Sequence, residues 1–256
     1  MRRDDLNRRR DQIIQLLCEN EALSAADLAE RLDVSVQTIR TDLRDLDNAA
    51  LVQRRGGMVR LRQQSENIGY SPRSSVSRGE KQSIALAVKN LVPDGARVAL
   101  GTGTTVEACA RLLATREKLF VATNNLHAAF ALQMAPDAVV ELAGGTLRLR
   151  DLDVIGGDST RFFAGFRVDQ AIFSCGGISA TGEVLDYNRD EVAARTAIAG
   201  CAHQKILVVD STKFNHDLPC RHGQLWDYDY VIVGGVLAEE LATQCAKSGC
   251  TVISVG

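Results

Sequence analysis

The chain has 256 residues, of which 45% are hydrophobic and 24% are charged, values that exclude a disordered or fibrous protein. The 30 Lys and Arg against 32 Asp and Glu give a net charge of −2, which as a total argues against a nucleic-acid binder. The length allows one large domain or one large and one small domain, and no apolar run reaches the roughly 18 residues of a membrane span. The 7 cysteines form no close pairs and the arginine-rich start lacks the apolar stretch of a secretory signal, so we expect a reduced, cytoplasmic protein.

The charges are unevenly distributed along the chain. Residues 1–62 hold 12 Arg and 11 Asp or Glu, and the arginines cluster in the first ten residues and again at 54–62, where no acid occurs. The clustered arginines are Arg2, Arg3, Arg8, Arg9, Arg10, Arg54, Arg55, Arg60 and Arg62. Because local potential attracts a charged partner, a near-neutral total is compatible with a basic binding surface.

Two helices are expected near the start of the chain. Residues 11–19 carry apolar side chains at helical spacing, and a second helix begins after Ser24, which with Asp27 forms an N-terminal capping pattern. The apolar positions expected to be buried by these helices are Ile13, Ile14, Leu17, Leu28 and Leu32.

A third helix is expected after a very short turn. Only Asp33 and Val34 separate the second helix from Ser35, the predicted N-cap of the third, and this spacing is typical of a helix-turn-helix. The face expected to point inward comprises Val36, Ile39, Leu43 and Leu46. The opposite stripe can hydrogen-bond to base edges or phosphates and comprises Gln37, Arg40, Thr41 and Arg44.

A hairpin follows the third helix. Residues 51–55 and 58–61 flank Gly56-Gly57, a two-residue hairpin signal, and we interpret the hairpin as a wing whose arginines contact phosphates. The alternative is a small helical interaction domain whose third helix is merely amphipathic. Helix, short turn, helix and basic wing occur together in the right order, which favours DNA binding.

The rest of the chain is predicted to form a separate domain. Residues 63–79 are rich in Ser and Gly and have no sustained period, so we interpret them as a linker between a DNA-binding domain, 1–62, and a larger domain, 80–256. Helical stretches then alternate with short apolar strands, which predicts a Rossmann-like α/β domain with a mostly parallel sheet and helices on both faces. The expected strands are Arg97–Leu100, Leu119–Thr123, Val139–Leu142, Gln170–Ser174, Lys205–Asp210, Tyr230–Val233 and Thr251–Val255.

Glycine, hydroxyl and amide residues gather where these strands end, and ligands of open parallel sheets bind beyond the carboxyl ends of strands. Gly101–Thr105 leads from the first strand into a helix and has the composition of a phosphate cradle at a helix N-terminus. It lacks the Lys of a P-loop and the spacing of a dinucleotide fingerprint. Each site alone is more often a simple turn, whereas their convergence on one sheet edge favours a binding site. The candidate residues are Gly101, Thr102, Gly103, Thr104, Thr105, Thr123, Asn124, Asn125, Gly144, Gly145, Arg148, Gly176, Gly177, Asp210 and Lys213.

Residues 34–46, followed by Arg54-Arg55-Gly56-Gly57, resemble the DeoR family of bacterial transcription regulators. The resemblance continues through Glu80-Lys81, Thr123-Asn124-Asn125, Gly144-Gly145 and Asp210-Ser211-Thr212-Lys213-Phe214, and so covers nearly the whole chain. It implies that the third helix enters the major groove. The implied DNA-binding residues are Ser35, Gln37, Thr38, Arg40, Thr41, Arg44, Arg54, Arg55, Gly56 and Gly57.

The resemblance also implies that the large domain resembles ribose-5-phosphate isomerase in fold and binds phosphorylated sugars. It adds Glu191 and Arg195 to the expected ligand residues, and Gly101–Thr105 is similar to the phosphate loop of those isomerases. The chain departs from the usual family pattern at three positions: Thr41 replaces an Arg, Gly101 an Asp and Arg195 a Lys. Arg keeps the charge of Lys and can bind phosphate as a fork.

A sugar-phosphate isomerase-like enzyme with an accessory DNA-binding module is the alternative. Such an enzyme needs a carboxylate base and an acid at the reacting carbon. The available carboxylates, Asp169, Asp186 and Glu191, are interpreted as helix caps or surface charges, so no catalytic residues are assigned. The 4 histidines have no ligand spacing, and neither a metal site nor a cofactor is expected.

The sequence therefore predicts a sequence-specific DNA-binding regulator and not an enzyme. We expect a repressor of a carbohydrate catabolic operon whose partners are a double-stranded DNA operator and a phosphorylated sugar effector, with no membrane association. Because helix-turn-helix proteins bind symmetric half-sites, a homodimer or homotetramer is expected.

Overall fold

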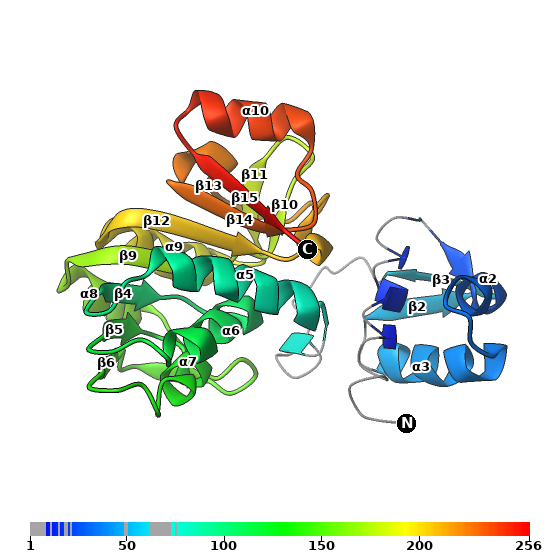
Figure 1. Cartoon of the computed structure of the whole chain (residues 1–256), viewed down its shortest axis with the longest axis horizontal. Helices are drawn as coiled ribbons and strands as arrows, with labels where there is room; N and C mark the ends of the chain where they lie inside the picture. Colours follow the sequence, from blue (N-terminus) through cyan, green and yellow to red (C-terminus); the bar gives the residue numbers. More distant parts are fainter. Residues whose placement is uncertain are drawn as a thin grey trace. The chain divides into compact units, whose positions relative to one another are not determined.

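The chain divides into two compact units, Met1–Gly79 and Glu80–Gly256, each with a hydrophobic core (Figure 1). The structure, a computed structural model, describes residues 9–10, 12–14, 16–17, 20, 22–48, 51–61, 73–74 and 76–256. Of the expected linker, residues 63–72 and 75 lie outside the described part, and helix α5 (Arg78–Leu91) takes the last two linker residues. Among the described residues, no helix is long and apolar enough to cross a membrane.

The first unit is a small helical domain with a three-stranded sheet. Those residues of the predicted first helix that the structure describes are helical. The further elements are β1 (Leu23–Ser24), α2 (Ala25–Arg31), α3 (Val36–Asn48), β2 (Val52–Arg55) and β3 (Met58–Leu61), with strand order β1-β3-β2. The predicted helix-turn-helix and hairpin are confirmed, whereas β1 was not foreseen because two residues show no period.

Local interactions explain where α2 begins and ends. Ser24 Oγ accepts a hydrogen bond from the Asp27 N–H at 3.1 Å, and the Asp27 carboxylate accepts one from the Ser24 N–H at 2.9 Å. This is the predicted capping box. At the other end Asp33 adopts a φ of 50°, a left-handed conformation that turns the chain toward the next helix.

The hairpin turn requires its two glycines. Gly56 and Gly57 have φ values of 59° and 78°, the positive pair of a type I′ turn, and Arg55 and Met58 face each other across it. A side chain at either glycine position would strain this turn.

The core of the first unit contains the apolar residues expected from the helical spacing, with one exception. Ile39 and Leu43 are fully buried, but Val36 is 37% exposed, so its predicted inward orientation is wrong. Val36 lies in the first turn of α3 between Ser35 and Gln37, which are also exposed. The buried face of α3 therefore begins at Ile39.

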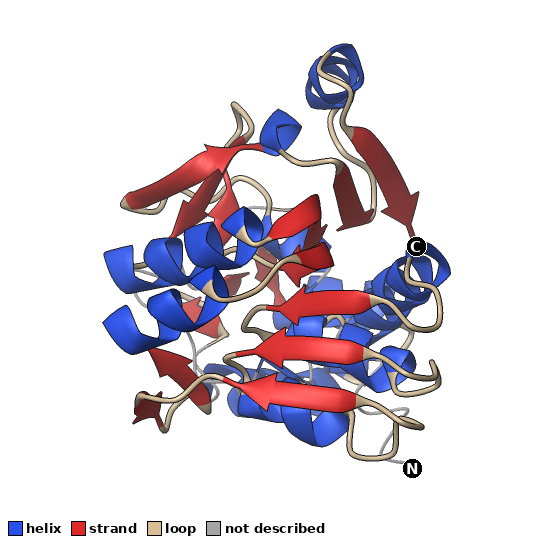
Figure 2. Ribbon diagram, turned by 90° about the vertical axis from the view of Figure 1, so that its left-hand side faces the viewer, coloured by secondary structure: helices blue, strands red, loops and turns tan. Residues whose placement is uncertain are grey.

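The second unit is built on a seven-stranded sheet of order β15-β14-β12-β9-β4-β5-β6, in which every neighbouring pair is parallel. Figure 2 shows helices on both sides of these strands. The strands are β4 (Arg97–Leu100), β5 (Phe120–Thr123), β6 (Val139–Leu142), β9 (Val168–Phe173), β12 (Ala202–Val209), β14 (Tyr230–Gly234) and β15 (Thr251–Val255). The predicted mostly parallel α/β sheet is confirmed.

Two cores separate the helices into layers. One core packs α5, α6 (Thr104–Leu113) and α7 (Leu126–Ala131) against one face of the sheet. The other packs α8 (Gly157–Ala164), α9 (Arg189–Gly200) and α10 (Glu239–Lys247) against the opposite face. Successive residues of a strand point to opposite faces, so Val98 and Leu100 lie in the first core and Ala99 in the second.

Short strands beyond the sheet were not predicted. They are the hairpin β7 (Thr146–Arg148) and β8 (Asp153–Ile155) and the antiparallel sheet β10 (Gly177–Ile178), β11 (Glu183–Asp186) and β13 (Cys220–Gln224). Two single-turn helices, η1 (Ser211–Lys213) and η2 (Leu225–Asp227), complete the unit. Each of the short strands contains at most two consecutive apolar residues, too few to indicate a strand from the sequence.

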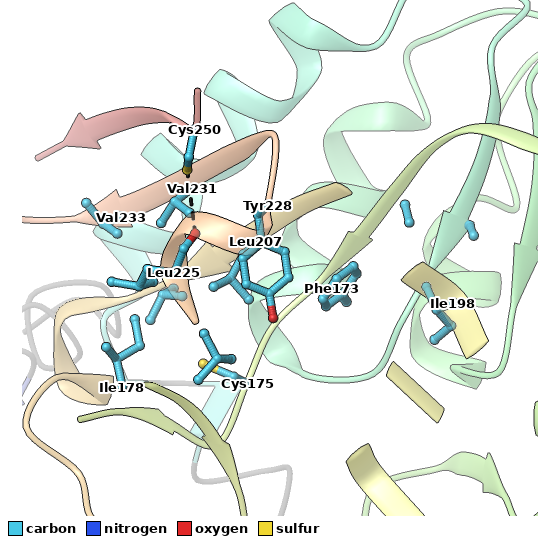
Figure 3. Close-up of a cluster of buried hydrophobic side chains, with 14 of the residues drawn as sticks. Phe173, Cys175, Ile178, Ile198, Leu207, Leu225, Tyr228, Val231, Val233 and Cys250 are labelled. Carbon is cyan, nitrogen blue, oxygen red and sulfur yellow. Dashed lines mark hydrogen bonds between the residues drawn. The ribbon is translucent and has the colours of Figure 1, made fainter. Parts of the chain in front are cut away.

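A buried apolar cluster joins the antiparallel sheet to the parallel one. Figure 3 shows Cys175, Ile178, Leu225 and Tyr228 gathered near Phe173, all of them buried. Burial raises the pKa of the Cys175 thiol to about 12, so this cysteine acts as a small hydrophobic residue. The six cysteines among the described residues are free thiols.

Candidate functional site

The third helix presents a polar stripe opposite its buried face. Gln37, Arg40, Thr41 and Arg44 are exposed, whereas Ile39 and the leucines of the other face are buried. Ser35 Oγ accepts a hydrogen bond from the Thr38 N–H at 3.1 Å, so Ser35 caps the helix as predicted. The structure thus brings the expected DNA-contacting residues of α3 onto one surface.

Thr41, which stands where the family pattern has Arg, is engaged within the helix. Its hydroxyl donates to the Gln37 carbonyl at 3.1 Å. The hydroxyl proton is therefore used internally, and Thr41 offers an external partner only acceptor lone pairs and a methyl group.

The wing places a second set of basic residues in solvent. Arg54, Arg55, Gly56 and Gly57 are all exposed at the tip of the hairpin. Within the described part of the chain, Arg40, Arg54 and Arg55 form no ion pair. Their guanidinium groups can bind an external anion without first breaking an internal pair.

A buried aspartate on α3 was not recognised from the sequence. Asp42 is 1% exposed, and its carboxylate accepts hydrogen bonds from Arg9 Nε at 2.6 Å and from Arg10 Nε at 3.2 Å. Arg10 also pairs with Asp45. These two arginines of the basic N-terminal cluster therefore contact α3, while Arg2, Arg3, Arg8 and Arg62 lie outside the described residues. The available signal was an acid between Ile39 and Leu43 on the apolar face.

The large unit has a topological switch point between β4 and β9. From β4 the chain proceeds outward to β5 and β6 and then returns to β9 on the other side of β4. Ligands of such sheets bind at this point, beyond the carboxyl ends of the strands. The loops that meet there are Gly101–Thr105 after β4 and Ser174–Gly177 after β9.

The Gly101–Thr105 loop leads into helix α6 without a side-chain cap. Gly103 has a φ of 113° and is the N-cap of α6 with no side-chain cap, so the first N–H groups of α6 are left for an external acceptor. A Cβ at Gly101 would lie 2.9 Å from the Cβ of Phe173. Phe173 and Ile198 therefore leave no room for a side chain at position 101.

Asp210 connects this loop to the end of β12. Thr105 Oγ1 donates to Asp210 Oδ2 at 3.3 Å, and Lys81 Nζ lies 3.9 Å from the same oxygen. Burial alone would raise the pKa of Asp210, but the positive charges of Lys81 and Lys213 and hydrogen bonds from Thr212 hold it below its ordinary value. The loop, Asp210 and Lys213 are therefore brought together as predicted, around an ionised carboxylate.

Other predicted ligand residues have structural partners. Thr123 Oγ1 donates to the Leu100 carbonyl at 2.8 Å, Asn125 Nδ2 to the Gly101 carbonyl at 3.2 Å and Asn124 Nδ2 to the Val154 carbonyl at 3.0 Å. Asn124 Oδ1 is buried and accepts no hydrogen bond from the described residues. These side chains shape the strand ends from within the core.

The remaining predicted glycines are explained by turns and packing. A Cβ at Gly177 would lie 2.4 Å from His216, and one at Gly176 would lie 2.8 Å from Leu218. Gly145 has a φ of 130° in an exposed turn beside Gly144.

Arg148 and Arg195 lie in ion pairs. Arg148 donates to both oxygens of Asp153, at 2.9 and 2.6 Å, and to Glu191 at 3.0 Å. Arg195 Nε lies 3.0 Å from Asp186 Oδ2 and donates to the Ser174 carbonyl. Their charges are thus balanced by carboxylates, and Arg195 supports the loop after β9.

Asp186 and Glu191 are not the caps or surface charges that the sequence suggested. They are 0% and 4% exposed and form a buried pair beside Arg195, whereas Asp169 does lie at the surface, paired with Arg97. Burial raises the pKa of Asp186 to about 7, despite Arg195, and Glu191 adds to the rise. Burial also acts to raise the pKa of Glu191, but Arg195 and Arg148 outweigh it and hold that pKa below its ordinary value. The sequence did not show that the turn from β11 into α9 buries both carboxyls.

No three His, Cys, Asp or Glu side chains of the described residues are grouped so as to hold a metal ion. A winged helix-turn-helix with exposed arginines, followed in the chain by an α/β unit, is typical of the class of DNA-binding regulators.

Comparison with known proteins identifies the family. The DeoR-like helix-turn-helix domain matches residues 9–64 and the DeoR C-terminal sensor domain matches residues 77–235. The chain is 38% identical over 228 residues to the glycerol-3-phosphate regulon repressor of Haemophilus influenzae, covering 89% of both chains. It is 34% identical to the Escherichia coli glycerol-3-phosphate regulon repressor (87% of this chain, 88% of the relative) and to the E. coli repressor CsqR (82% and 80%).

Matching solved structures include ribose 5-phosphate isomerase A from Methanocaldococcus jannaschii, at 17% identity and a TM-score of 0.38 over 54% of each chain.

The chain belongs to the DeoR family and is a DNA-binding transcriptional regulator. The regulator interpretation is thereby favoured over the enzyme alternative.

Proposed function

We propose that the protein represses a carbohydrate catabolic operon and that a phosphorylated sugar or polyol releases it from its operator. In this proposal residues 1–62 bind the operator and residues 80–256 bind the effector. Residues 63–79 form the linker between these two domains. The observation that carries the effector site is the uncapped N-terminus of α6 at Gly103, beside Thr105, Asp210 and Lys213 at the switch point. A helix N-terminus with a nearby Lys binds phosphate through N–H donors and positive charge.

Relatives make glycerol 3-phosphate the first effector to test. Two of the similar proteins are named glycerol-3-phosphate regulon repressors, and they match this chain over most of its length. Three further ligand residues proposed from the sequence, Asn124, Glu191 and Arg195, are buried and act on such an effector by shaping the site around it.

A thermal-shift screen tests the effector class. Glycerol 3-phosphate, ribose 5-phosphate and fructose 6-phosphate are compared with their unphosphorylated forms. A ligand at 100 times its dissociation constant stabilises the folded protein by about 2.7 kcal/mol, so the effector raises the melting temperature measurably. Stabilisation by an unphosphorylated form equal to that by its phosphate would contradict the phosphate cradle.

Gly103→Asp provides the matched genetic test. It places a negative charge at the cradle and forces a non-glycine residue to a φ of 113°. We expect the variant to bind operator but to lose the thermal shift and induction; retention of both would exclude this loop.

We further propose that the protein acts in the cytoplasm as a homodimer or homotetramer and does not turn over the sugar phosphate. The oligomer follows from the symmetric half-sites of helix-turn-helix operators. Formation of ribulose 5-phosphate from ribose 5-phosphate by the purified protein would contradict the non-enzymatic part.

A further inference from the structure

The start of helix α5 contacts the carboxyl ends of strands β12 and β14 in the large unit. Glu80 accepts hydrogen bonds from the Ser211 N–H at 2.8 Å and from the Ser211 hydroxyl at 2.7 Å. Its carboxylate lies against Gly234 at the end of β14, where a Cβ would lie 2.3 Å from Glu80 Oε2. The next residue, Lys81, is 5% exposed and approaches Asp210. Two consecutive residues of α5 thus contact the two consecutive residues that follow β12.

Asp210 links this attachment to the proposed effector loop. Its Oδ2 faces both Lys81 Nζ and the Thr105 hydroxyl, and its Oδ1 accepts hydrogen bonds from the N–H and hydroxyl of Thr212. Thr105 lies in the first turn of α6, where the cradle offers its N–H groups to phosphate. A phosphate there competes for the Thr105 hydroxyl, attracts the Lys81 ammonium and repels the Asp210 carboxylate.

The attachment is close in sequence to the DNA-binding unit. Val76 is 8% exposed and packs in the core of the first unit, and Glu80 is held in the second. Between them lie Ser77 and the first two residues of α5, Arg78 and Gly79, which form the last part of the proposed 63–79 linker. Ser77 has a φ of 52°, a conformation that non-glycine residues adopt at a cost. Three residues span at most about 11 Å, so a shift at the start of α5 displaces the chain that leads directly into the first unit.

We propose that the Glu80–Ser211 and Lys81–Asp210 contacts couple the effector site to the DNA-binding unit. Phosphate at Thr104–Thr105 weakens the ion pair between Lys81 and Asp210, and the start of α5 then shifts. The inference rests on the proposed function, since it requires an effector at the Gly101–Thr105 loop. Coupling of this kind appears as a change in operator affinity on effector binding.

A pair of glycine substitutions tests the coupling in the full chain. Gly234→Ala drives a methyl group into the Glu80 carboxylate, whereas Gly200→Ala, in α9, meets nothing within 4 Å.

Two quantities are measured in each variant. The first is the dissociation constant for glycerol 3-phosphate, with inorganic phosphate as a second probe. The second is the coupling ratio, which is the ratio of operator dissociation constants with and without glycerol 3-phosphate. We expect Gly200→Ala to match the wild type in both. Gly234→Ala should bind glycerol 3-phosphate within about threefold of wild type, with a coupling ratio at least about fivefold smaller.

Glu80→Gln serves as a second variant that adds no bulk. It removes the charge that receives the two Ser211 hydrogen bonds, and the same loss of coupling with retained effector binding is expected. Wild-type coupling in either folded variant would overturn the inference and leave the proposed function intact. Loss of glycerol 3-phosphate binding in Glu80→Gln would place Glu80 in the site itself and would equally overturn it. If wild-type protein binds neither probe, the proposed effector site fails, and the coupling with it.

Discussion

Arg40 is central to the exposed stripe of α3, and no ion pair with a described residue competes for it. If Arg40 reads a base, Arg40→Ala should weaken operator binding by about 1–3 kcal/mol in a fluorescence-anisotropy titration. Arg31→Ala is the control, because Arg31 is an exposed arginine at the end of α2. Equal operator affinity of the two variants would remove Arg40 from the interface.

Asp42 should matter to stability more than to recognition. Asp42→Asn removes a buried negative charge that two arginines contact, and should lower the free energy of unfolding by about 3 kcal/mol. Asp45→Asn is the control, since Asp45 pairs with the same Arg10 but is 39% exposed; its effect should stay below about 1 kcal/mol. Urea denaturation of the two variants measures the difference, and equal losses would show that Asp42 does not hold α3.

Asp186 makes stability depend on pH. The pKa of Asp186 is 3.8 in the unfolded chain and is raised to about 7 in the folded protein. Between these two pH values the folded state binds more protons than the unfolded state. The contribution of Asp186 to the free energy of unfolding therefore falls as the pH rises from 3.8 to 7. The lowered pKa of Glu191 acts in the opposite sense only below its unfolded value of 4.5. From pH 5 to 7 we expect stability to fall by at most about 1.4 kcal/mol per pH unit, and Asp186→Asn to flatten this slope. An unchanged slope in the variant would assign the proton elsewhere.

At the scale of elements, the wing should supply affinity without sequence preference. Each phosphate contact by an arginine contributes about 0.9 to the slope of log affinity against log salt. Replacing Arg54 and Arg55 together by Ala should therefore reduce the slope by about 2 on specific and non-specific DNA alike. A loss confined to the specific operator would mean that the wing reads bases.

Elements with a strong local signal were predictable and the others were not. The capping box at Ser24, the Gly56-Gly57 turn and the seven parallel strands follow from residues next to one another in sequence. The antiparallel strand β13, Cys220–Gln224, has no apolar alternation and exists only because β11 pairs with it. Likewise the loop at Gly101–Thr105 was visible, but the Asp186–Glu191 pair and the Arg9–Asp42 contact depend on tertiary packing.

At the scale of the whole molecule, the charge total of −2 averages over two units with different chemistry. The first presents exposed arginines on α3 and on the hairpin, and the second holds Lys81 and Arg148 beside buried carboxylates. Our central claim is that an anion bound at the effector site of the second unit changes the affinity of the first unit for DNA. Linkage requires that the operator change effector affinity by the same factor.

The most direct test is an operator titration of the full-length protein with and without saturating glycerol 3-phosphate, paired with effector titrations of free and operator-bound protein. We predict that the effector raises the operator dissociation constant about 5- to 150-fold and that the operator weakens effector binding by an equal factor. Loss of effector binding in Gly103→Asp would show that the effector binds at Gly101–Thr105. If such an effector left the operator affinity of the wild-type protein unchanged, the account would be contradicted.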